Sequence, residues 1–172
     1  MAFKTPGGQE PPILLFSGMI DRTKIEKLVN SYIAGKDIFP VDVKITRDNR
    51  ITVLVDTPAG ITLEQCAELN RFIEKNLSRN EEDYDLQVSS PGIGHPFTVK
   101  EQYVKNTGKM IEVVNLKGEK QRGILKKVTE SGFELECVPK KKSKSVPEAA
   151  EIKIISFNFD EVKSAKEYFV FR

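Results

Sequence analysis

The stretch that decides the fold is Tyr84–Phe97, which reads YDLQVSSPGIGHPF. Tyr84, Leu86 and Val88 alternate with polar residues, and this period of two predicts a half-buried strand. Prolines and glycines then follow. Proline fixes φ and lacks an N–H donor, and glycine adopts backbone angles that other residues avoid, so the strand has to end there. We therefore predict a shaped, polar loop over residues 89–96, named the pivot loop, with one domain before it and another after it.

Composition places the chain among ordinary globular proteins. Its 172 residues suit one domain or two small ones, and 39% are hydrophobic and 30% charged. No run of about 18 apolar residues occurs, so no membrane span is expected. The formal net charge is only +2, which gives no strong global field of the kind that attracts nucleic acid. Residues 109–172 carry 14 Lys/Arg and 10 Asp/Glu, against 13 and 15 in residues 1–108, so a mild basic bias lies late in the chain.

The two cysteines, Cys66 and Cys137, lie far apart and in different predicted elements. Neither has a second cysteine at the spacing of metal ligands. This pattern favours reduced, mostly buried thiols over a disulfide. It fits a cytoplasmic protein without a metal site.

Residues 19–97 predict an N-terminal α/β domain. Asp21 is a suitable N-cap, and apolar residues at helical spacing follow it. Two alternating stretches joined by a short polar turn predict an antiparallel hairpin with one buried face. Thr62 and Gln65 then predict a capping box before a second amphipathic helix. The order α-β-β-α-β favours two helices over one face of a three-stranded sheet, and residues 1–18 before it predict a flexible extension or a leader.

Residues 108–172 predict a second, all-β domain after a linker at residues 98–107. Gly123, inside one alternating stretch, is typical of a sharp bend at a barrel corner. We predict a helical turn over residues 159–165 and a last short strand over residues 168–171. Several short strands within about 65 residues favour a small closed β-barrel, because closure removes exposed edges. The predicted fold class is therefore α+β.

The sequence offers no recognisable reaction centre. It has no Gly-rich phosphate loop followed by a lysine, no Rossmann fingerprint and no zinc-ligand spacing. Its single histidine, His95, could serve a cysteine-dependent hydrolase only if the fold brought Cys66 beside it. Cys66 lies on the apolar stripe of the second helix, which favours a core residue. We predict a binding protein that is not an enzyme and uses no cofactor, with the hydrolase as an alternative.

Two groups of residues are candidates for binding. In the pivot loop, hydroxyls, backbone N–H groups and an imidazole suit phosphate or ribose contacts, and a rigid linker is the alternative interpretation. Lysines in the second domain suit a phosphate backbone, and a solvated surface is the alternative there. The candidate contact residues are Ser89, Ser90, Gly92 and His95 in the loop, and Lys126, Lys127, Lys140, Lys141, Lys142 and Lys144 in the second domain.

Several motifs together resemble the RimP family of bacterial ribosome maturation factors. They are GITLEQC at residues 60–66, YDLQVSSPG at residues 84–92, LKGEKQRGIL at residues 116–125 and FNFDEVKSA at residues 157–165. The resemblance covers nearly all of residues 19–172. Val-Ser-Ser-Pro-Gly is its most specific part, because it follows the capped helix in the right order.

Two features depart from the family pattern. Before Pro96 the family usually has an acidic residue and an arginine, whereas this chain has Gly94 and His95. The arginine would be the obvious phosphate contact, and a histidine replaces it only weakly near neutral pH. The loop over residues 140–149 is also longer than the usual barrel turn.

The resemblance implies a specific role. It implies an N-terminal α/β domain followed by an Sm-like (SH3-type) barrel. It also implies binding to the free small ribosomal subunit, through rRNA and a ribosomal protein near the decoding centre, during late assembly. We expect a cytoplasmic monomer that contacts no membrane. The competing hypothesis is a protein-only adaptor whose exposed barrel edge pairs with an extended partner segment.

Overall fold

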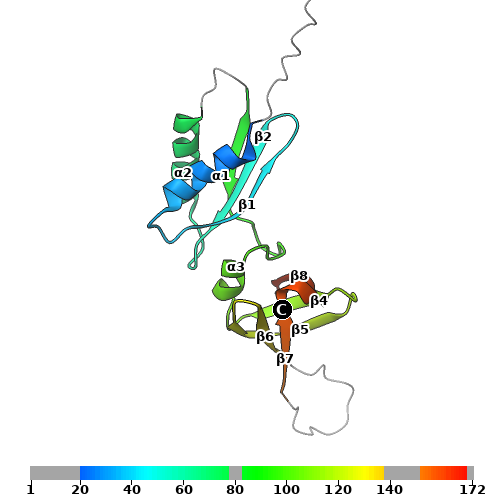
Figure 1. Cartoon of the computed structure of the whole chain (residues 1–172). Coiled ribbons are helices and arrows are strands. Elements are labelled where there is room, and N and C mark those ends of the chain that lie inside the picture. Colours follow the sequence, from blue (N-terminus) through cyan, green and yellow to red (C-terminus); the bar gives the residue numbers. More distant parts are fainter. Residues whose placement is uncertain (1–19, 78–82, 138–151, 170–172) are drawn as a thin grey trace, which may run out of the picture.

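The computed structural model describes residues 20–77, 83–137 and 152–169. Two sheets, each with its own hydrophobic cluster, lie one above the other in Figure 1. We refer to the described residues up to Phe97 as the N-terminal half and to those from Thr98 onward as the C-terminal half. The predicted extension at residues 1–18 lies outside the described residues.

The N-terminal half follows the predicted α-β-β-α-β order. Its elements are α1 (Arg22–Ile33), β1 (Phe39–Ile45), β2 (Arg50–Asp56), α2 (Leu63–Asn76) and β3 (Asp85–Ser89). The Asp21 side chain accepts from the Thr23 N–H and begins α1, as predicted. Thr62 and Gln65 form the predicted capping box at the start of α2.

Both long helices cover the same face of the three-stranded sheet (Figure 1). The strand order is β1-β2-β3, with β1 antiparallel and β3 parallel to β2, so α2 is the crossover between two parallel strands. Ile25 from α1, Leu69 and Ile73 from α2 and Ile51 and Val53 from β2 are fully buried between the layers. The predicted two-layer arrangement of this half is confirmed.

One extra residue interrupts the pairing of β1 with β2. Pro40 pairs with Val55 and Asp42 with Leu54, which leaves Val41 as the bulged residue. A bulge takes a peptide group out of the ladder and re-aims it. The freed carbonyl of Val41 faces the C-terminal half, where it accepts from the Thr98 hydroxyl at 3.3 Å.

The C-terminal half contains one short helix and an antiparallel sheet in the order β7-β6-β5-β4-β8. Its elements are α3 (Lys100–Lys105), β4 (Met110–Asn115), β5 (Lys120–Val128), β6 (Gly132–Cys137), β7 (Lys153–Asn158), the 3-10 turn η1 (Phe159–Glu161) and β8 (Val162–Glu167). Tyr103 of α3 packs into the cluster of this half together with Phe97, Phe133 and Phe159. The segment predicted to be a linker thus contributes α3 to this core.

Gly123 of β5 lies close against the backbone of β6. A methyl group at this position would collide with the carbonyl oxygen of Glu136 and the side chain of Leu135. The pairing of β5 with β6 also shifts between Leu125 and Lys127, so the strand bends just after the glycine. The shift lies between Leu125 and Lys127, so the predicted sharp bend at Gly123 itself stays a prediction.

The last strand begins earlier than predicted. Residues 162–165, predicted to continue a helical turn, belong to β8, and only Phe159–Glu161 is helical. Pairing with β4 explains the difference, since Ile111, Val113 and their neighbours hold β8 along its length. Tyr168 and Phe169 follow β8 without regular structure, so the predicted strand over residues 168–171 is wrong for its described part.

Among the described residues no ladder joins β7 to β8, so the five strands form an open sheet. The closed Sm-like barrel stays a prediction. None of the helices in the described ranges is long and apolar enough to cross a membrane.

Candidate functional site

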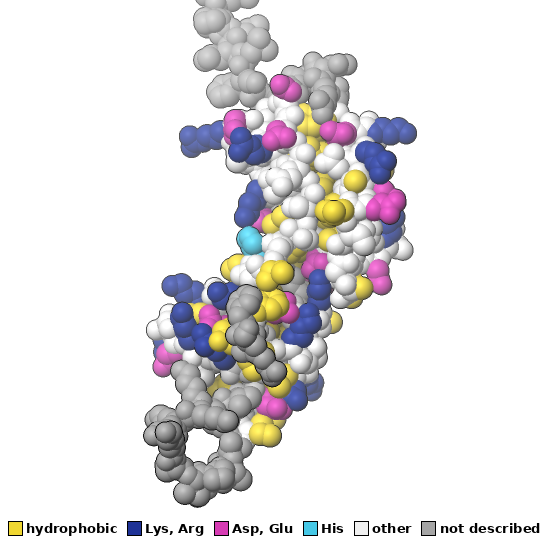
Figure 2. Space-filling view, turned by 180° about the vertical axis from the view of Figure 1, so that it is seen from behind, with side chains coloured by type: hydrophobic (Ala, Val, Ile, Leu, Met, Phe, Trp, Pro, Cys, Tyr) yellow, Lys and Arg dark blue, Asp and Glu magenta, His cyan; other side chains and the backbone are white. Residues whose placement is uncertain are grey.

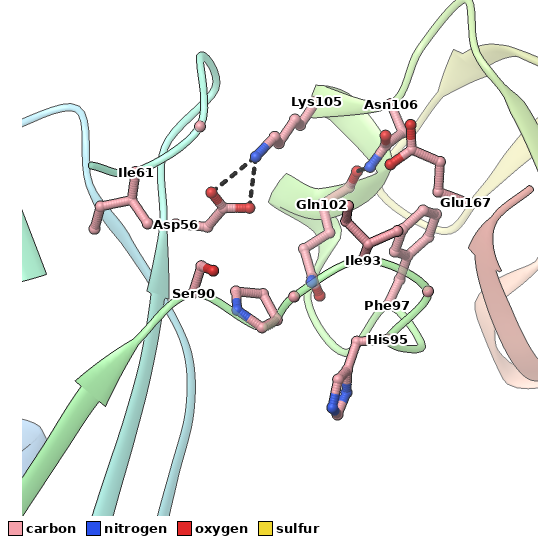
Figure 3. Close-up of a pocket in the computed structure, with 14 residues that line it drawn as sticks. Asp56, Ile61, Ser90, Ile93, His95, Phe97, Gln102, Lys105, Asn106 and Glu167 are labelled. Carbon is pink, nitrogen blue, oxygen red and sulfur yellow. Dashed lines mark hydrogen bonds and ion pairs between the residues drawn. The ribbon is translucent and has the colours of Figure 1, made fainter. Parts of the chain in front are cut away.

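A cavity of about 210 Å³ lies where the two halves meet, and we name it the waist cavity (Figure 3). It is assembled from the end of β2 and the following loop, the pivot loop, α3 and the end of β8. The lining residues that matter below are Asp56, Ile61, Ser90, Ile93, Phe97, Gln102, Lys105, Asn106 and Glu167. Both halves therefore have to be in place for the cavity to exist.

An ion pair closes one side of the waist cavity. The Lys105 ammonium donates to Oδ1 and Oδ2 of Asp56, at 2.8 and 2.7 Å (Figure 3). The Asp56 side chain is 10% exposed and that of Lys105 is 18% exposed. Asp56 Oδ1 also accepts from the Thr57 backbone N–H at 2.8 Å. Both carboxylate oxygens are thus occupied, and the pair joins the end of β2 to α3.

The pivot loop crosses the waist between two anchored ends. It leaves β3 at Ser89, and the Phe97 N–H donates to the Ala165 carbonyl of β8 at 2.7 Å. Gly92 and Gly94 have φ values of +77° and +78°, a backbone region that side chains with a Cβ disfavour. The glycines therefore let the chain turn sharply here, as the sequence predicts.

Helix α3 is fixed on both sides. The Gln102 side chain is buried, and its Oε1 accepts from the Thr98 and Val99 N–H groups at 2.7 and 3.3 Å. Thr98 in turn reaches back to the Val41 carbonyl of the N-terminal half. On the other face of α3, Tyr103 is buried in the hydrophobic cluster of the C-terminal half. This burial raises the pKa of its phenol group to about 12. Helix α3 thus carries contacts to both halves.

The inner wall of the waist cavity presents hydrogen-bond acceptors. Asn106, the C-cap of α3, is 4% exposed, and its Oδ1 has no hydrogen-bond donor among the described residues. Glu167, at the end of β8, lines the same cavity, and Figure 3 shows its carboxylate turned toward the Asn106 side chain. Oε1 of Glu167 lies 3.4 Å from the Lys109 ammonium.

Three of the four candidate residues of the pivot loop line the waist cavity, namely Ser90, Gly92 and His95. Ser89 is the half-buried last residue of β3 and does not line it. The imidazole of His95 is exposed and points away from the Asp56–Lys105 pair (Figure 3). In Figure 2 the histidine lies at the surface between the two halves. The loop therefore presents His95 to the outside and Ser90 toward the cavity.

The candidate lysines lie elsewhere. Lys126 and Lys127 are exposed on β5, and Lys126 forms an ion pair with Glu136 at 2.9 Å. Neither residue lines the waist cavity. The four other candidates, Lys140, Lys141, Lys142 and Lys144, lie outside the described residues. The structure therefore does not bring the predicted loop contacts and the predicted lysines into one site.

Cys66 and His95 do not form a catalytic pair. Cys66 is 7% exposed within the core of the N-terminal half and does not line the waist cavity, whereas His95 is exposed on the pivot loop. Burial, and then the negative charge of Asp56, raise the pKa of the Cys66 thiol. A nucleophilic cysteine requires the opposite shift. No cluster of possible metal ligands occurs within the described ranges.

Sequence reasoning missed the residues that build the waist cavity. Asp56, Lys105 and Asn106 come from separate elements, and no local motif links them. It also missed a cluster of Arg122, Glu112 and Tyr168 on the C-terminal sheet. There Arg122 pairs with Glu112 at 2.6 Å and lies 4.2 Å from the centre of the Tyr168 ring. The alternation of β5 could have placed Arg122 on an outer face, but not its two partners.

Comparison with known proteins places these features in a family context. The family model described as RimP N-terminal domain matches residues 25–94. A relative from Porphyromonas gingivalis, named Ribosome maturation factor RimP, is 33% identical over 141 residues, which cover 80% of this chain and 93% of the relative. The match extends over both halves, because neither half alone holds 141 residues.

Two further relatives carry the same name. The protein from Christiangramia forsetii is 33% identical over 93 residues, covering 54% of this chain and 61% of the relative. The protein from Chlorobium limicola is 34% identical over 91 residues, covering 46% of this chain and 51% of the relative.

Proposed function

This chain belongs to the RimP family of ribosome maturation factors, and on that basis we propose that it binds the free small ribosomal subunit and assists its assembly without catalysing a reaction. The observation that carries the proposal is the match over 93% of the Porphyromonas relative. The raised pKa of the buried Cys66 thiol disfavours the alternative of a cysteine-dependent hydrolase.

We propose that the two halves are separate domains held in a fixed orientation. Each half has its own hydrophobic cluster. Polar contacts cross between them, among them Asp56 with Lys105, Thr98 with the Val41 carbonyl, and the Phe97 N–H with the Ala165 carbonyl. A fixed orientation lets both halves contact one large partner at once, which raises affinity through effective concentration. Closure of the C-terminal sheet into an Sm-like barrel is part of the proposal.

Two surfaces are proposed to contact the subunit. The first is the outer side of the pivot loop, with His95 and its neighbours Ser89, Ser90 and Gly92. The second is basic and comprises Lys126 and Lys127 on β5 and Lys140, Lys141, Lys142 and Lys144 in the following segment. Contacts of lysines with phosphates are salt-dependent, because each releases counterions. The partners are then rRNA and a protein of the small subunit, in the cytoplasm.

Sedimentation of the full chain with purified small subunits over a salt series tests the proposal. We expect co-sedimentation that weakens as salt rises, and we expect Lys127→Glu to weaken it further. Lys24→Glu, an equal charge change on exposed α1, is the matched control. Equal retention on subunits and on beads carrying an unrelated protein would overturn the ribosomal role.

One observation favours a second candidate, a protein-only adaptor. Strand β7 is at the edge of the C-terminal sheet; Ile154 on this strand is 58% exposed, and Ile152 just before it is 67% exposed. An edge strand with apolar side chains can pair with an extended partner segment. Binding of that kind would be nearly insensitive to salt, and charge reversal at Lys140, Lys141 and Lys142 would leave it unchanged. The salt series therefore separates the two candidates.

A further inference from the structure

The waist cavity contains a buried acceptor that lacks a donor. Asn106 is 4% exposed, and its Nδ2 donates to the Gln102 carbonyl at 2.8 Å. This bond fixes the orientation of the amide, because the reverse orientation would place two acceptors together. Oδ1 is then left without a donor among the described residues. Buried acceptors are normally paired, so an unpaired one at a cavity wall points to a ligand with N–H groups.

Glu167 makes the same wall negative. Its side chain is 27% exposed, and its only ion pair within the described ranges is a long one, with the exposed Lys109 at 3.4 Å. Asp56 adds a second carboxylate to the cavity, but Lys105 already occupies both its oxygens. The groups on this wall that can still bind a ligand are therefore hydrogen-bond acceptors, namely Asn106 Oδ1 and the Glu167 carboxylate. Such a wall repels phosphate and attracts a cation that carries N–H donors.

Apolar side chains form another part of the lining, and the space is small. Ile61, Phe97 and Ile93 line the cavity, and Ile93 is 84% exposed at its rim. At about 210 Å³ the cavity is smaller than typical small-molecule pockets, which hold roughly 300–1,000 Å³. It suits one side chain with an aliphatic stem and a polar head better than a nucleotide. An exposed isoleucine at the rim gives such a stem an apolar surface to cover.

We propose that the waist cavity binds one arginine side chain of a partner polypeptide, with the guanidinium between Asn106 Oδ1 and the Glu167 carboxylate and the methylene stem against Ile93. A guanidinium presents several N–H donors in one plane, so it serves two separate acceptors at once. A lysine ammonium lacks this fork and binds less tightly. The site stands on the geometry of the cavity and does not depend on the proposed ribosomal role.

Nuclear magnetic resonance titration of the isotope-labelled full chain tests this assignment. The probe is the tripeptide acetyl-Gly-Arg-Gly-amide, and the control is the same peptide with citrulline, which has nearly the same shape but no charge. We expect saturable shifts of the Asn106 side-chain amide and of the Gly92 and Gly94 signals with the arginine peptide. The citrulline peptide should bind about tenfold more weakly, since a charge-assisted hydrogen bond is lost.

Variants separate the site from general charge effects. Glu167→Gln and Asn106→Leu should each weaken binding of the arginine peptide by roughly tenfold. Lys109→Ala removes the competing internal cation and should strengthen it. Glu101→Gln, the same charge change on the exposed side of α3, is the matched control and should leave it unchanged.

Three results would overturn the proposal. They are equal binding of the arginine and citrulline peptides, shifts that map away from the waist cavity, and weaker binding after Lys109→Ala. The titration is also run with free spermidine, which gives a fourth result that would overturn the proposal. If spermidine bound as tightly as the arginine peptide, the cavity would be a site for free polyamines and not for a polypeptide side chain.

Discussion

Lys105 and Asp56 are 49 residues apart in sequence, and their bidentate ion pair joins α3 of the C-terminal half to the end of β2 in the N-terminal half. Both side chains are largely buried at this junction. A buried ion pair contributes to orientation more reliably than to net stability, because desolvation offsets much of the attraction. The pair therefore determines how the two halves meet and, with it, the shape of the waist cavity.

Breaking one side of this pair should loosen the junction. Lys105→Met leaves the Asp56 carboxylate buried with only the Thr57 N–H as a partner, which should cost on the order of 3 kcal/mol at the junction. The two halves would then separate in part, and small-angle X-ray scattering should give a larger radius of gyration. The double variant Asp56→Leu/Lys105→Met leaves no unpaired charge and should recover most of the stability. Equal destabilisation in the single and double variants would contradict this account of the junction.

Removing the unpaired acceptor of Asn106 should stabilise the protein. An unsatisfied buried acceptor costs about 1–3 kcal/mol, whereas the Nδ2 bond lost with it contributes about 1 kcal/mol. After the substitution the Gln102 carbonyl still accepts a hydrogen bond from the backbone N–H of residue 106, at 3.2 Å. Asn106→Leu should therefore raise the free energy of unfolding by about 1 kcal/mol in denaturant titration.

Asn76→Leu is the matched control for this prediction. Asn76 is exposed at the end of α2, and its Nδ2 donates to the Phe72 carbonyl at 2.8 Å, the same local bond. It has no buried acceptor to remove, so the substitution should give no gain. A gain of similar size at both positions would show that leucine acts through helix propensity alone.

Glu112 should make the C-terminal half sensitive to acid. Hydrogen bonds from Arg122 hold the pKa of this buried carboxyl below its ordinary value of 4.5. The unfolded chain therefore binds a proton at a higher pH than the folded one does. The pair stabilises the fold above the unfolded pKa, and its contribution is lost as the pH falls through the lower folded pKa.

Glu112→Gln should flatten the loss of stability between about pH 5 and pH 3, measured by urea unfolding at each pH. Arg122→Met should have a larger effect. Without its partner the buried Glu112 favours the neutral carboxyl, so folding stability should then rise, and not fall, as the pH is lowered. An unchanged pH dependence in both variants would exclude Glu112 as its source.

Gly123→Ala should destabilise the C-terminal sheet through collision with the Glu136 carbonyl. The obstacle is backbone and cannot rotate away, so we expect a loss of about 3 kcal/mol in thermal unfolding. Gly118→Ala is the control for the effect of replacing a glycine where no collision occurs. Gly118 has a φ of +82° but open space around its Cβ position, so the expected cost is about 1 kcal/mol. Equal losses at the two positions would argue against close strand contact as the cause.

The sequence predicted the N-terminal half well because its signals are local. The capping box of Thr62 and Gln65 lies within one helical turn, and the alternation from Tyr84 to Val88 lies within one strand. The same approach failed at residues 162–165. There a short run without clear periodicity follows a helical turn, and only pairing with β4 makes it a strand.

The waist cavity could not be predicted for a related reason. Ser90, Gly92 and His95 were identified because prolines and glycines mark a shaped loop. Asp56, Asn106 and Glu167 carry no such mark, since their roles arise only when the ends of β2, α3 and β8 meet. A lysine in a linker resembles any solvated lysine until its partner is known.

Because of the bulge at Val41, the number of residues in β1 helps to determine how the two halves are arranged. The group that receives the Thr98 hydroxyl is a main-chain carbonyl, which every amino acid possesses. Replacing the valine therefore leaves the acceptor in place, whereas deleting a single residue would return that carbonyl to the ladder. The joint tolerates exchange of its side chain but not a change in the length of its strand.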